Sequence, residues 1–333
     1  MNQRERVINA IQHKNTDFLP YQLDLTQGVY ERLSGYYGDS EFLYTRVGNH
    51  LVREKNKNHK SLDAFRYKDI FGVTWHKEQE GGDIGIVKDF VFTEPRMDLF
   101  EFPKPDADLI GKKCKNIVDS HPNLFKIYEI GFSLYERAWT LRGMDNLLMD
   151  FVLNEDFVDE LFDRILEYNL GVIDIAAKYQ IDCIMFGDDW GQQKGLIMGP
   201  KLWNRFIKPR MAMMYDRVKK HGLYICHHSC GDNYQLFKDL IDMGLDIYNT
   251  FQPEVYDIKK FKEEFGKDLT VYGGISTQGV LANGTPSEVR DETKRMMELL
   301  GGDGGYIVAP THQITTDAPL ENILAFVDTI QNQ

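Results

Sequence analysis

DCIMFGD (182–188) and LYICHHS (223–229), with a helical pattern between them, open the stretch of sequence that decides the fold. The alternation continues through LDIYNT (245–250), LTVYGG (269–274) and YIVAP (306–310), with helical patterns between them. Short β-rich runs that alternate with helices through short connections are typical of a parallel sheet. This half of the chain therefore predicts five strand–helix units, and it carries no signal for an antiparallel hairpin.

Two further strand candidates come earlier in the chain, at LPYQLDL (19–25) and KIYEIG (126–131). An eighth strand is expected near residues 69–75 or 84–92. Eight strands favour a closed barrel over an open doubly wound sheet, and no GxGxxG motif follows the first strand to indicate a dinucleotide-binding fold. We therefore predict an α/β fold, a TIM-type (β/α)8 barrel, with residues 1–333 forming a single domain.

Two segments depart from this regular pattern. Residues 71–108 mix aromatic residues, glycines and prolines, which predicts a long irregular insertion rather than a second domain. Residues 53–60, with the sequence REKNKNHK, read as a solvated charged segment. Neither segment resembles a linker between two domains.

The charge balance narrows the classes of function. The 39 Lys and Arg residues against 51 Asp and Glu residues give a formal net charge of −12, which argues against nucleic-acid binding and against docking on anionic membranes. The start of the chain has no apolar core of a secretory signal, and no apolar run approaches the roughly 20 residues of a membrane helix. Four cysteines are too few for a disulfide framework in a chain of this length. We expect a cytoplasmic protein with free thiols.

Polar, titratable or glycine residues follow nearly every predicted strand. The active site of a TIM-type barrel lies at the carboxyl ends of its strands, so these residues are the candidates for chemistry. Asp188 and Asp189 are the candidate catalytic residues; adjacent side chains on an extended chain point oppositely, so one can face the cavity while the other caps a segment. The candidate substrate-binding residues are Asp24, Asn249, Gln252 and Gly274, the last of which a tight turn explains equally well.

The strongest local signal is CHHSC (226–230). Alternation along a strand places Cys226, His228 and Cys230 on one face. Imidazole and thiolate suit zinc, and a catalytic zinc takes three protein ligands and keeps one position open. His312 follows the last predicted strand and is the natural third ligand. We therefore predict a zinc site of His228, Cys230 and His312.

Other interpretations of this motif remain open. His228 and Cys230 could pack inside the barrel mouth without a metal, because buried free cysteine is common in proteins. Cys226 is the obvious rival ligand, although a core position explains it more simply. His227, on the opposite face, is predicted to be a structural histidine held by a hydrogen bond.

Several motifs together resemble the uroporphyrinogen decarboxylase superfamily, and the resemblance covers nearly the whole chain. It implies a TIM-like barrel, usually dimeric in the decarboxylases. The motifs that carry it are RERVINAIQHKNTDFLP (4–20), MFGDDWGQQKGLIMGP (185–200), HHSCGD (227–232), NTFQPE (249–254), VYGGISTQGVL (271–281) and YIVAPTHQITTDAPLENI (306–323).

The superfamily holds two chemistries, and the resemblance to each is different. Its decarboxylases work without metal and grip substrate carboxylates with an arginine-rich N-terminal motif. The matching residues 21–33 contain only Arg32, and the family's pyrrole-binding carboxylate would fall near Asp69. Its zinc methyltransferases bind the metal through a His-x-Cys pair and a later Cys. This chain keeps His228 and Cys230 and has His312 at the later position, where the decarboxylases also have a histidine.

The resemblance and the predicted site together favour methyl transfer. We predict a zinc-dependent methyltransferase that moves a methyl group between a corrinoid protein and a thiol or similar acceptor, with a possible homodimer as its assembly. One alternative is a metal-independent decarboxylase of uroporphyrinogen or a related carboxylate, in porphyrin metabolism. Another is a protein that binds a corrinoid or tetrapyrrole in the barrel mouth without turnover.

Overall fold

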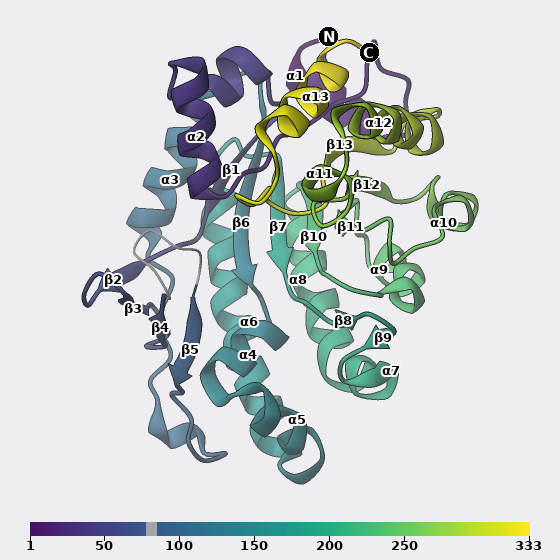
Figure 1. Ribbon diagram of the computed structural model, residues 1–333. Helices are drawn as coiled ribbons and strands as arrows, with labels where there is room; N and C mark the ends of the chain where they lie inside the picture. The colour runs from purple at the N-terminus through teal and green to yellow at the C-terminus, as the bar shows by residue number, and fades with distance from the viewer. Residues whose placement is uncertain (78–84) are drawn as a thin grey trace.

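A parallel sheet of seven strands forms the centre of the computed structural model, which describes residues 1–77 and 85–333 (Figure 1). All neighbouring strands in the sheet run parallel. The strands, in spatial order, are β1 (Leu51–Lys55), β6 (Phe125–Phe132), β7 (Cys183–Gly187), β10 (Tyr224–His228), β11 (Ile247–Phe251), β12 (Thr270–Ile275) and β13 (Tyr306–Pro310). The six strands from β6 to β13 lie where the sequence predicts them.

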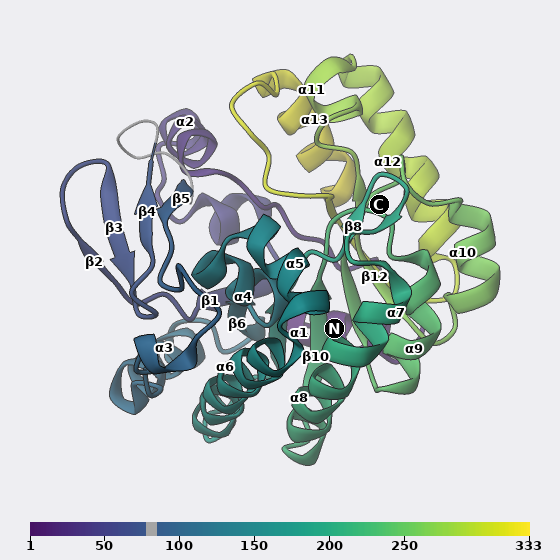
Figure 2. The same ribbon diagram turned by 90° about the horizontal axis from the view of Figure 1, so that it is seen from below.

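The sheet curls into an open ring with helices on its outside, as the view from below shows (Figure 2). This architecture is consistent with a TIM-type barrel. The helices are α1 (Gln3–Ile11), α2 (Gln27–Tyr37), α3 (Ala107–Ser120), α4 (Tyr135–Arg142), α5 (Met144–Leu153), α6 (Glu155–Ala176), α7 (Gly199–Leu202), α8 (Lys208–Lys220), α9 (Phe237–Asp242), α10 (Ile258–Phe265), α11 (Val280–Asn283), α12 (Pro286–Gly301) and α13 (Leu320–Gln331). That the whole chain forms one domain stays a prediction.

The inside of the ring is layered because side chains alternate along each strand. Its base is a buried apolar cluster in which Val7 and Ile11 of α1 meet one or two residues from each of the seven strands. Leu51 and Ile127 lie in this base, whereas Arg53 and Glu129, two residues further along the same strands, lie above it toward the carboxyl ends. Helix α1 therefore closes the amino end of the ring, and polar chemistry is confined to the other end.

The barrel strand that the sequence does not predict is β1, at residues 51–55, whereas the predicted strand at 19–25 forms only isolated bridges. Residues 20–26 run in an extended course beside β13, with bridges from Tyr21 to Val308 and from Leu25 to Ile314. On the other side, Tyr21 accepts the backbone N–H of His50, the residue before β1, at 3.2 Å. This segment thus joins the two edge strands of the sheet. The prediction of a strand near residues 69–75 or 84–92 in the barrel is wrong.

Those residues instead build a second, antiparallel sheet beside the barrel. It consists of β2 (His59–Ser61), β3 (Arg66–Asp69), β4 (Thr74–His76) and β5 (Ile86–Asp89). The expectation of irregular structure across 71–108 is therefore wrong for β4, β5 and the start of α3, while residues 78–84 of that range lie outside the described residues. The charged run 53–60 contains the end of β1 and the start of β2, and the prediction that it is solvated is wrong for Arg53, whose side chain is 15% exposed.

One antiparallel pair also lies in the second half of the chain, contrary to prediction. Strands β8 (Gly191–Gln192) and β9 (Gly195–Leu196) form a short hairpin after β7. Gly191 could not be another residue, since a Cβ there would lie 2.7 Å from the Asp232 nitrogen. This hairpin packs against the loop that follows β10 and helps to hold the candidate site.

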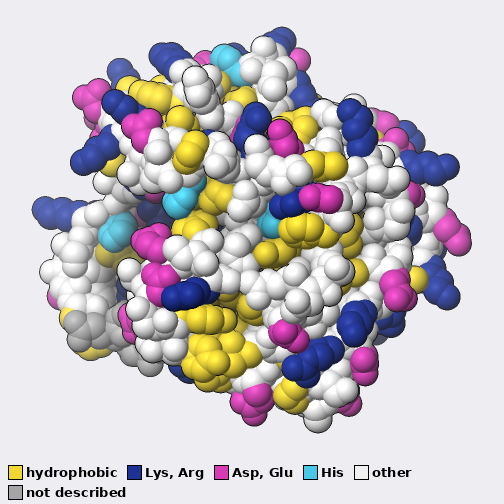
Figure 3. Space-filling view, turned by 90° about the horizontal axis from the view of Figure 1, so that it is seen from above, with side chains coloured by type: hydrophobic (Ala, Val, Ile, Leu, Met, Phe, Trp, Pro, Cys, Tyr) yellow, Lys and Arg dark blue, Asp and Glu magenta, His cyan; other side chains and the backbone are white. Residues whose placement is uncertain are grey.

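The surface agrees with the mixed charge of the sequence. In Figure 3 acidic and basic side chains are interspersed over the face shown, and hydrophobic side chains gather beside a hollow in it. Within residues 1–77 and 85–333, no helix is long and apolar enough to cross a membrane.

Candidate metal and substrate site

Three side chains of types that can bind a metal converge at the carboxyl end of the sheet. His228 ends β10, Cys230 follows two residues later, and His312 follows β13. One ligand atom from each residue lies within 4.8 Å of the other two, and Cys230 Sγ lies 3.7 Å from His228 Nε2. Strands β10 and β13 are separated in the sheet by β11 and β12. These residues are therefore brought together by the curl of the sheet, and not by closeness along the chain.

Asn249 fixes the orientation of the His228 ring. Its amide nitrogen donates to the Tyr272 carbonyl at 3.0 Å, so its oxygen must be the atom that faces His228. That oxygen lies 2.7 Å from His228 Nδ1 and can only accept, which places the ring proton on Nδ1. Nε2 is left with its lone pair toward Cys230. Asn249, predicted to bind substrate, thus lies behind the cluster as its support.

The Cys230 thiol is not an activated nucleophile. Burial, reinforced by the nearby Asp189 carboxylate, raises the pKa of Cys230 to about 12. Desolvation and the neighbouring His228 also lower the pKa of His312, so its imidazole is neutral at neutral pH. The cluster therefore offers neutral imidazole beside a thiol that needs a cation to ionise, which is the chemistry of a metal site rather than of a free thiolate.

The adjacent carboxylates Asp188 and Asp189 have different surroundings. Asp188 is fully buried and accepts the backbone N–H groups of Tyr135 and Glu136 at 3.0 and 2.7 Å, which caps the first turn of α4. Burial raises the pKa of Asp188 to about 6. The two backbone hydrogen bonds, and a third from the Trp190 indole N–H, oppose this rise. Asp189 instead accepts the Cys230 N–H at 2.7 Å. Only Asp189 is placed beside the three-donor cluster.

Glu136 is a site residue that the sequence reasoning missed. It is buried in the first turn of α4, where burial and the neighbouring Asp189 and Asp188 raise its pKa well above the usual value. Its surroundings therefore favour the protonated form more than those of an ordinary glutamate do. In the sequence, Glu136 lies five residues beyond Gly131, the residue expected to end the strand. The motif SLYE (133–136), with a carboxylate soon after a strand, is the signal that points to it.

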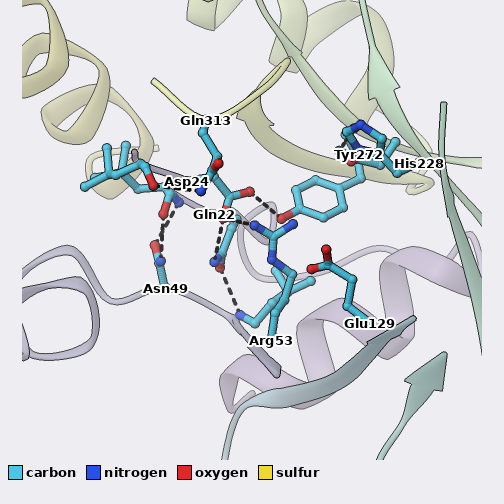
Figure 4. Close-up of polar contacts among 12 residues, drawn as sticks. Gln22, Asp24, Asn49, Arg53, Glu129, His228, Tyr272 and Gln313 are labelled. Atoms are coloured by element: carbon cyan, nitrogen blue, oxygen red, sulfur yellow. Dashed lines mark hydrogen bonds and ion pairs between the residues drawn. The ribbon is translucent and has the colours of Figure 1, made fainter. Parts of the chain in front are cut away.

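A second polar layer lies inside the ring, toward β1 (Figure 4). Arg53 pairs with Asp24 at 2.9 Å, and the Tyr272 hydroxyl donates to the same carboxylate at 2.6 Å. Lys55 and Arg53 hold the pKa of Glu129 below its usual value although burial opposes this. Asp24, predicted to bind substrate, is thus already paired. Arg53 and Glu129 were not predicted as site residues, because the first belongs to a run that reads as a solvated charged segment and the second lies within a predicted strand.

A small pocket adjoins the metal-binding cluster and has a volume of about 80 Å³. Gln252, a predicted substrate-binding residue, lines it and also accepts the Gly231 N–H at 2.9 Å. Gly274 does not line it: its φ is +92° and a Cβ there would lie 2.7 Å from the Tyr306 hydroxyl, so packing explains this glycine. The lining residues are Cys230, Thr250, Gln252, Glu254, Ser276, Thr277, Gln278, Thr311 and His312.

Comparison with known proteins places the chain in a family. The profile of the uroporphyrinogen decarboxylase (URO-D) family matches residues 135–333, more than half of the chain. The chain belongs to the uroporphyrinogen decarboxylase family. The matched region begins at α4 and includes Asp189, His228, Cys230 and His312, whereas Arg53 and Asp24 precede it.

Relatives within the uroporphyrinogen decarboxylase family carry both of its chemistries. The chain is 27% identical over 171 residues to a methylated-thiol–coenzyme M methyltransferase of Methanosarcina mazei, a match that covers 51% of this chain and 42% of that protein. It is 22% identical over 171 residues to a uroporphyrinogen decarboxylase of Thermus thermophilus, covering 51% and 47%. These matches span less than half the length of each relative.

A solved structure supports the fold along the entire chain. A methyltransferase from Methanosarcina mazei superimposes with a TM-score of 0.75 at 17% sequence identity, covering 100% of this chain and 99% of that one. This structural similarity shows that the present chain, a member of the uroporphyrinogen decarboxylase family, has the same fold as that methyltransferase. The choice between the two chemistries depends on the site.

Proposed function

We propose that this chain is a zinc-dependent methyltransferase that moves a methyl group between a corrinoid protein and a thiol or similar acceptor. The observation that carries the proposal is the convergence of His228, Cys230 and His312 within 4.8 Å of one another. The Methanosarcina mazei relative, named as a methyltransferase acting on thiols, supports the same chemistry. The corrinoid partner, the acceptor and a homodimer stay predictions from the resemblance.

The donor set fits zinc. Two imidazoles and one thiolate are ligands that zinc accepts, and three protein ligands leave one position for a substrate. The hydrogen bond from His228 Nδ1 to Asn249 is the type of support that metal-binding histidines receive. When bound, the ion would supply the positive charge that keeps a sulfur atom ionised at neutral pH.

The protein's own residues would position the acceptor and take its proton. The pocket beside Cys230 and His312 would hold the acceptor. Asp189 would accept the proton of its S–H group, with the buried carboxyl group of Glu136 as its neighbour. A bond then forms between the acceptor sulfur and the methyl carbon, while the carbon–cobalt bond breaks and leaves its electron pair on the corrinoid.

The site gives less support to decarboxylation of uroporphyrinogen. Arg32, the single arginine in residues 21–33, donates to the Ala318 carbonyl at 2.8 Å. Asp69, near which the family's pyrrole-binding carboxylate was expected, is paired with Arg137 at 2.6 Å in the small sheet. Neither residue is free to grip a tetrapyrrole with several carboxylates.

Metal content tests the proposal directly. Purified wild type should hold about one zinc per chain by elemental analysis, since three convergent donors fill a catalytic zinc site. His228→Ala, Cys230→Ala and His312→Ala should each lose it. Cys226→Ala is the matched control: this thiol is buried in the apolar base of the ring, two residues from His228, and its loss should leave the zinc in place.

Three outcomes would contradict the proposal. Wild type that takes up no zinc even after reconstitution would return the cluster to a packing role. Carbon dioxide release from uroporphyrinogen by metal-stripped protein would favour the decarboxylase instead. Full methyl transfer from a methylated corrinoid protein by His228→Ala and Cys230→Ala would exclude the proposed role of these residues.

A further inference from the structure

The pocket beside the metal-binding cluster has an unusual lining, which we use to infer the class of acceptor. Apart from Cys230 and His312, its walls are hydroxyl and amide side chains together with a single carboxylate, Glu254. None of the lining residues is a lysine, an arginine or a large apolar residue. A ligand of this pocket must therefore make hydrogen bonds, and the only formal charge it meets on the wall is negative.

One hydroxyl in the wall is free to bind a ligand. Thr250 is 2% exposed, and its Oγ1 makes no hydrogen bond to a nitrogen or oxygen atom of the described residues, although it lies beside the Cys230 sulfur. By contrast, the Thr277 and Thr311 hydroxyls lie 3.1 Å apart and satisfy each other, and Ser276 accepts the Gly279 N–H at 2.7 Å. A buried hydroxyl without a partner is costly, so a polar ligand group at Thr250 would remove that cost.

The pocket opens into a larger acidic groove. This groove, of about 700 Å³, shares Glu254 and Ser276 with the pocket. The cation of its lining, Arg295, is held by both oxygens of Glu292 at 2.7 Å. The groove is otherwise lined by Pro253, Gly279, Val280, Asn283, Gly284, Glu288 and Asp291. A path lined by carboxylates raises the local concentration of cations and lowers that of anions.

Within the described residues the pocket lining contains no lysine or arginine, although the charge of Arg53 acts on His312 from outside it. Arg53 is the nearby guanidinium, and it is paired with Asp24. In Figure 4 Tyr272 lies between Arg53 and His228, with its hydroxyl toward Asp24. On the pocket side the neighbouring charge is again negative, because Asp189 accepts the Cys230 N–H. An anionic group on the acceptor would therefore meet carboxylates without a countercharge.

We propose that the acceptor is a small thiol whose remaining polar group is uncharged or cationic, and that Glu254 is the residue that selects against anionic thiols. Thr250 would bind the polar group of the acceptor. This inference rests on the proposed function, since it assigns a substrate class to the same site. Because Glu254 is exposed, its selectivity should weaken as salt is added.

The test compares three two-carbon thiols whose second group is cationic, uncharged or anionic: cysteamine, 2-mercaptoethanol and 2-mercaptoethanesulfonate. Each is titrated by calorimetry into metal-loaded protein, and thiolate absorption of the cobalt(II)-substituted protein gives a second readout. Cysteamine and 2-mercaptoethanol should each bind at least about fivefold more tightly than the sulfonate, the effect expected of a partly screened carboxylate. This ratio should fall at high salt.

Variants separate the two residues. Glu254→Gln should reduce the preference for cysteamine over the sulfonate by about threefold or more and leave the affinity for 2-mercaptoethanol unchanged. Thr250→Val should lower the affinity for 2-mercaptoethanol by about fivefold and leave the metal content unchanged, since it removes one hydrogen bond to the ligand. Glu321→Gln, at the exposed start of α13, is the matched control and should change nothing.

The outcomes distinguish this inference from the proposed function. Metal-loaded protein that binds the sulfonate as tightly as cysteamine, or a Glu254→Gln variant with an unaltered preference, would overturn the inference and leave the methyltransferase proposal standing. Protein that binds neither metal nor any of the three thiols would overturn both.

Discussion

At the residue scale, the amide of Asn249 decides which nitrogen of His228 can bind a metal. The Asn249 oxygen accepts a hydrogen bond from His228 Nδ1 at 2.7 Å, while the Asn249 amide nitrogen donates to the Tyr272 carbonyl. The imidazole is therefore fixed in both tautomer and rotation before any ion arrives. Asn249 lies within β11, near its carboxyl end, and in the sequence this position suggested substrate binding.

Loss of this support should weaken metal binding without removing a ligand. We expect Asn249→Ala to lower zinc affinity by about ten- to a hundredfold, because the His228 ring loses its orientation. Competition with a chelator measures this affinity. Asn249→Asp keeps an oxygen toward His228 Nδ1 and should retain most of the zinc affinity. Asn332→Ala, at the exposed C-terminus, is the control. Equal affinity in wild type and Asn249→Ala would show that the hydrogen bond does not orient the ligand.

At the element scale, the period-two alternation of β-strands sorts the chemistry into layers. Along β1, Leu51 belongs to the apolar base and Arg53 to the polar layer; along β10, Cys226 and His228 repeat this order. The segment 20–26 completes the ring between the edge strands, but side chains make much of its contact with the β1 side. Asn49 both accepts the Leu23 N–H at 2.9 Å and donates to the Leu23 carbonyl at 3.1 Å.

The two hydrogen bonds between Asn49 and Leu23 take the place of backbone pairing between strands, so Asn49 should be important for stability. Asn49 is 1% exposed, so Asn49→Ala leaves a buried N–H and a buried carbonyl of Leu23 unpaired. We expect a loss of about 2–3 kcal/mol in the free energy of unfolding, measured by urea denaturation. Asn116→Ala, at an exposed position of α3, should cost nothing. A change below about 0.5 kcal/mol at Asn49 would mean that water or relaxation satisfies these groups.

At the scale of the whole molecule, folding buries a histidine where the ring is closed. His50 is 1% exposed and packs on Tyr21 with ring centroids 4.5 Å apart. Burial, with a contribution from Arg6, lowers the pKa of His50 from 6.5 to about 4. The unfolded chain therefore takes up a proton as the pH falls through 6.5, whereas the folded chain does not until about pH 4.

This difference predicts acid sensitivity of the fold. The stability that depends on a neutral His50 is complete above pH 6.5 and is lost as the pH falls toward 4. It amounts to about 2 kcal/mol between pH 7.5 and 5. In urea unfolding at both pH values, His50→Phe, which keeps an aromatic ring, should lose about 2 kcal/mol less than wild type. His59→Phe, at an exposed position of β2, should behave like wild type. A wild-type slope in His50→Phe would refute this account.

The sequence by itself determined the features that depend on residues a few positions apart. Six strands of the central sheet lie where predicted, namely β6, β7, β10, β11, β12 and β13. The shared face of Cys226, His228 and Cys230 was also predicted correctly, since it follows from alternation alone. His227 has its hydrogen bond, with Tyr215 at 2.9 Å. Local periodicity is written in neighbouring residues, so a single chain reveals it.

Only the tertiary structure decided which distant residues meet. The approach of His312 to His228 depends on the curl of the sheet, which accumulates the twist of every strand between β10 and β13. The same curl turns Arg53 inward, although it belongs to a run that reads as solvated. Asp188 and Asp189 are equivalent in sequence, and the position of α4 alone assigns the first to a cap and leaves the second at the site. Such contacts depend on summed geometry across many strands, and no local pattern encodes that sum.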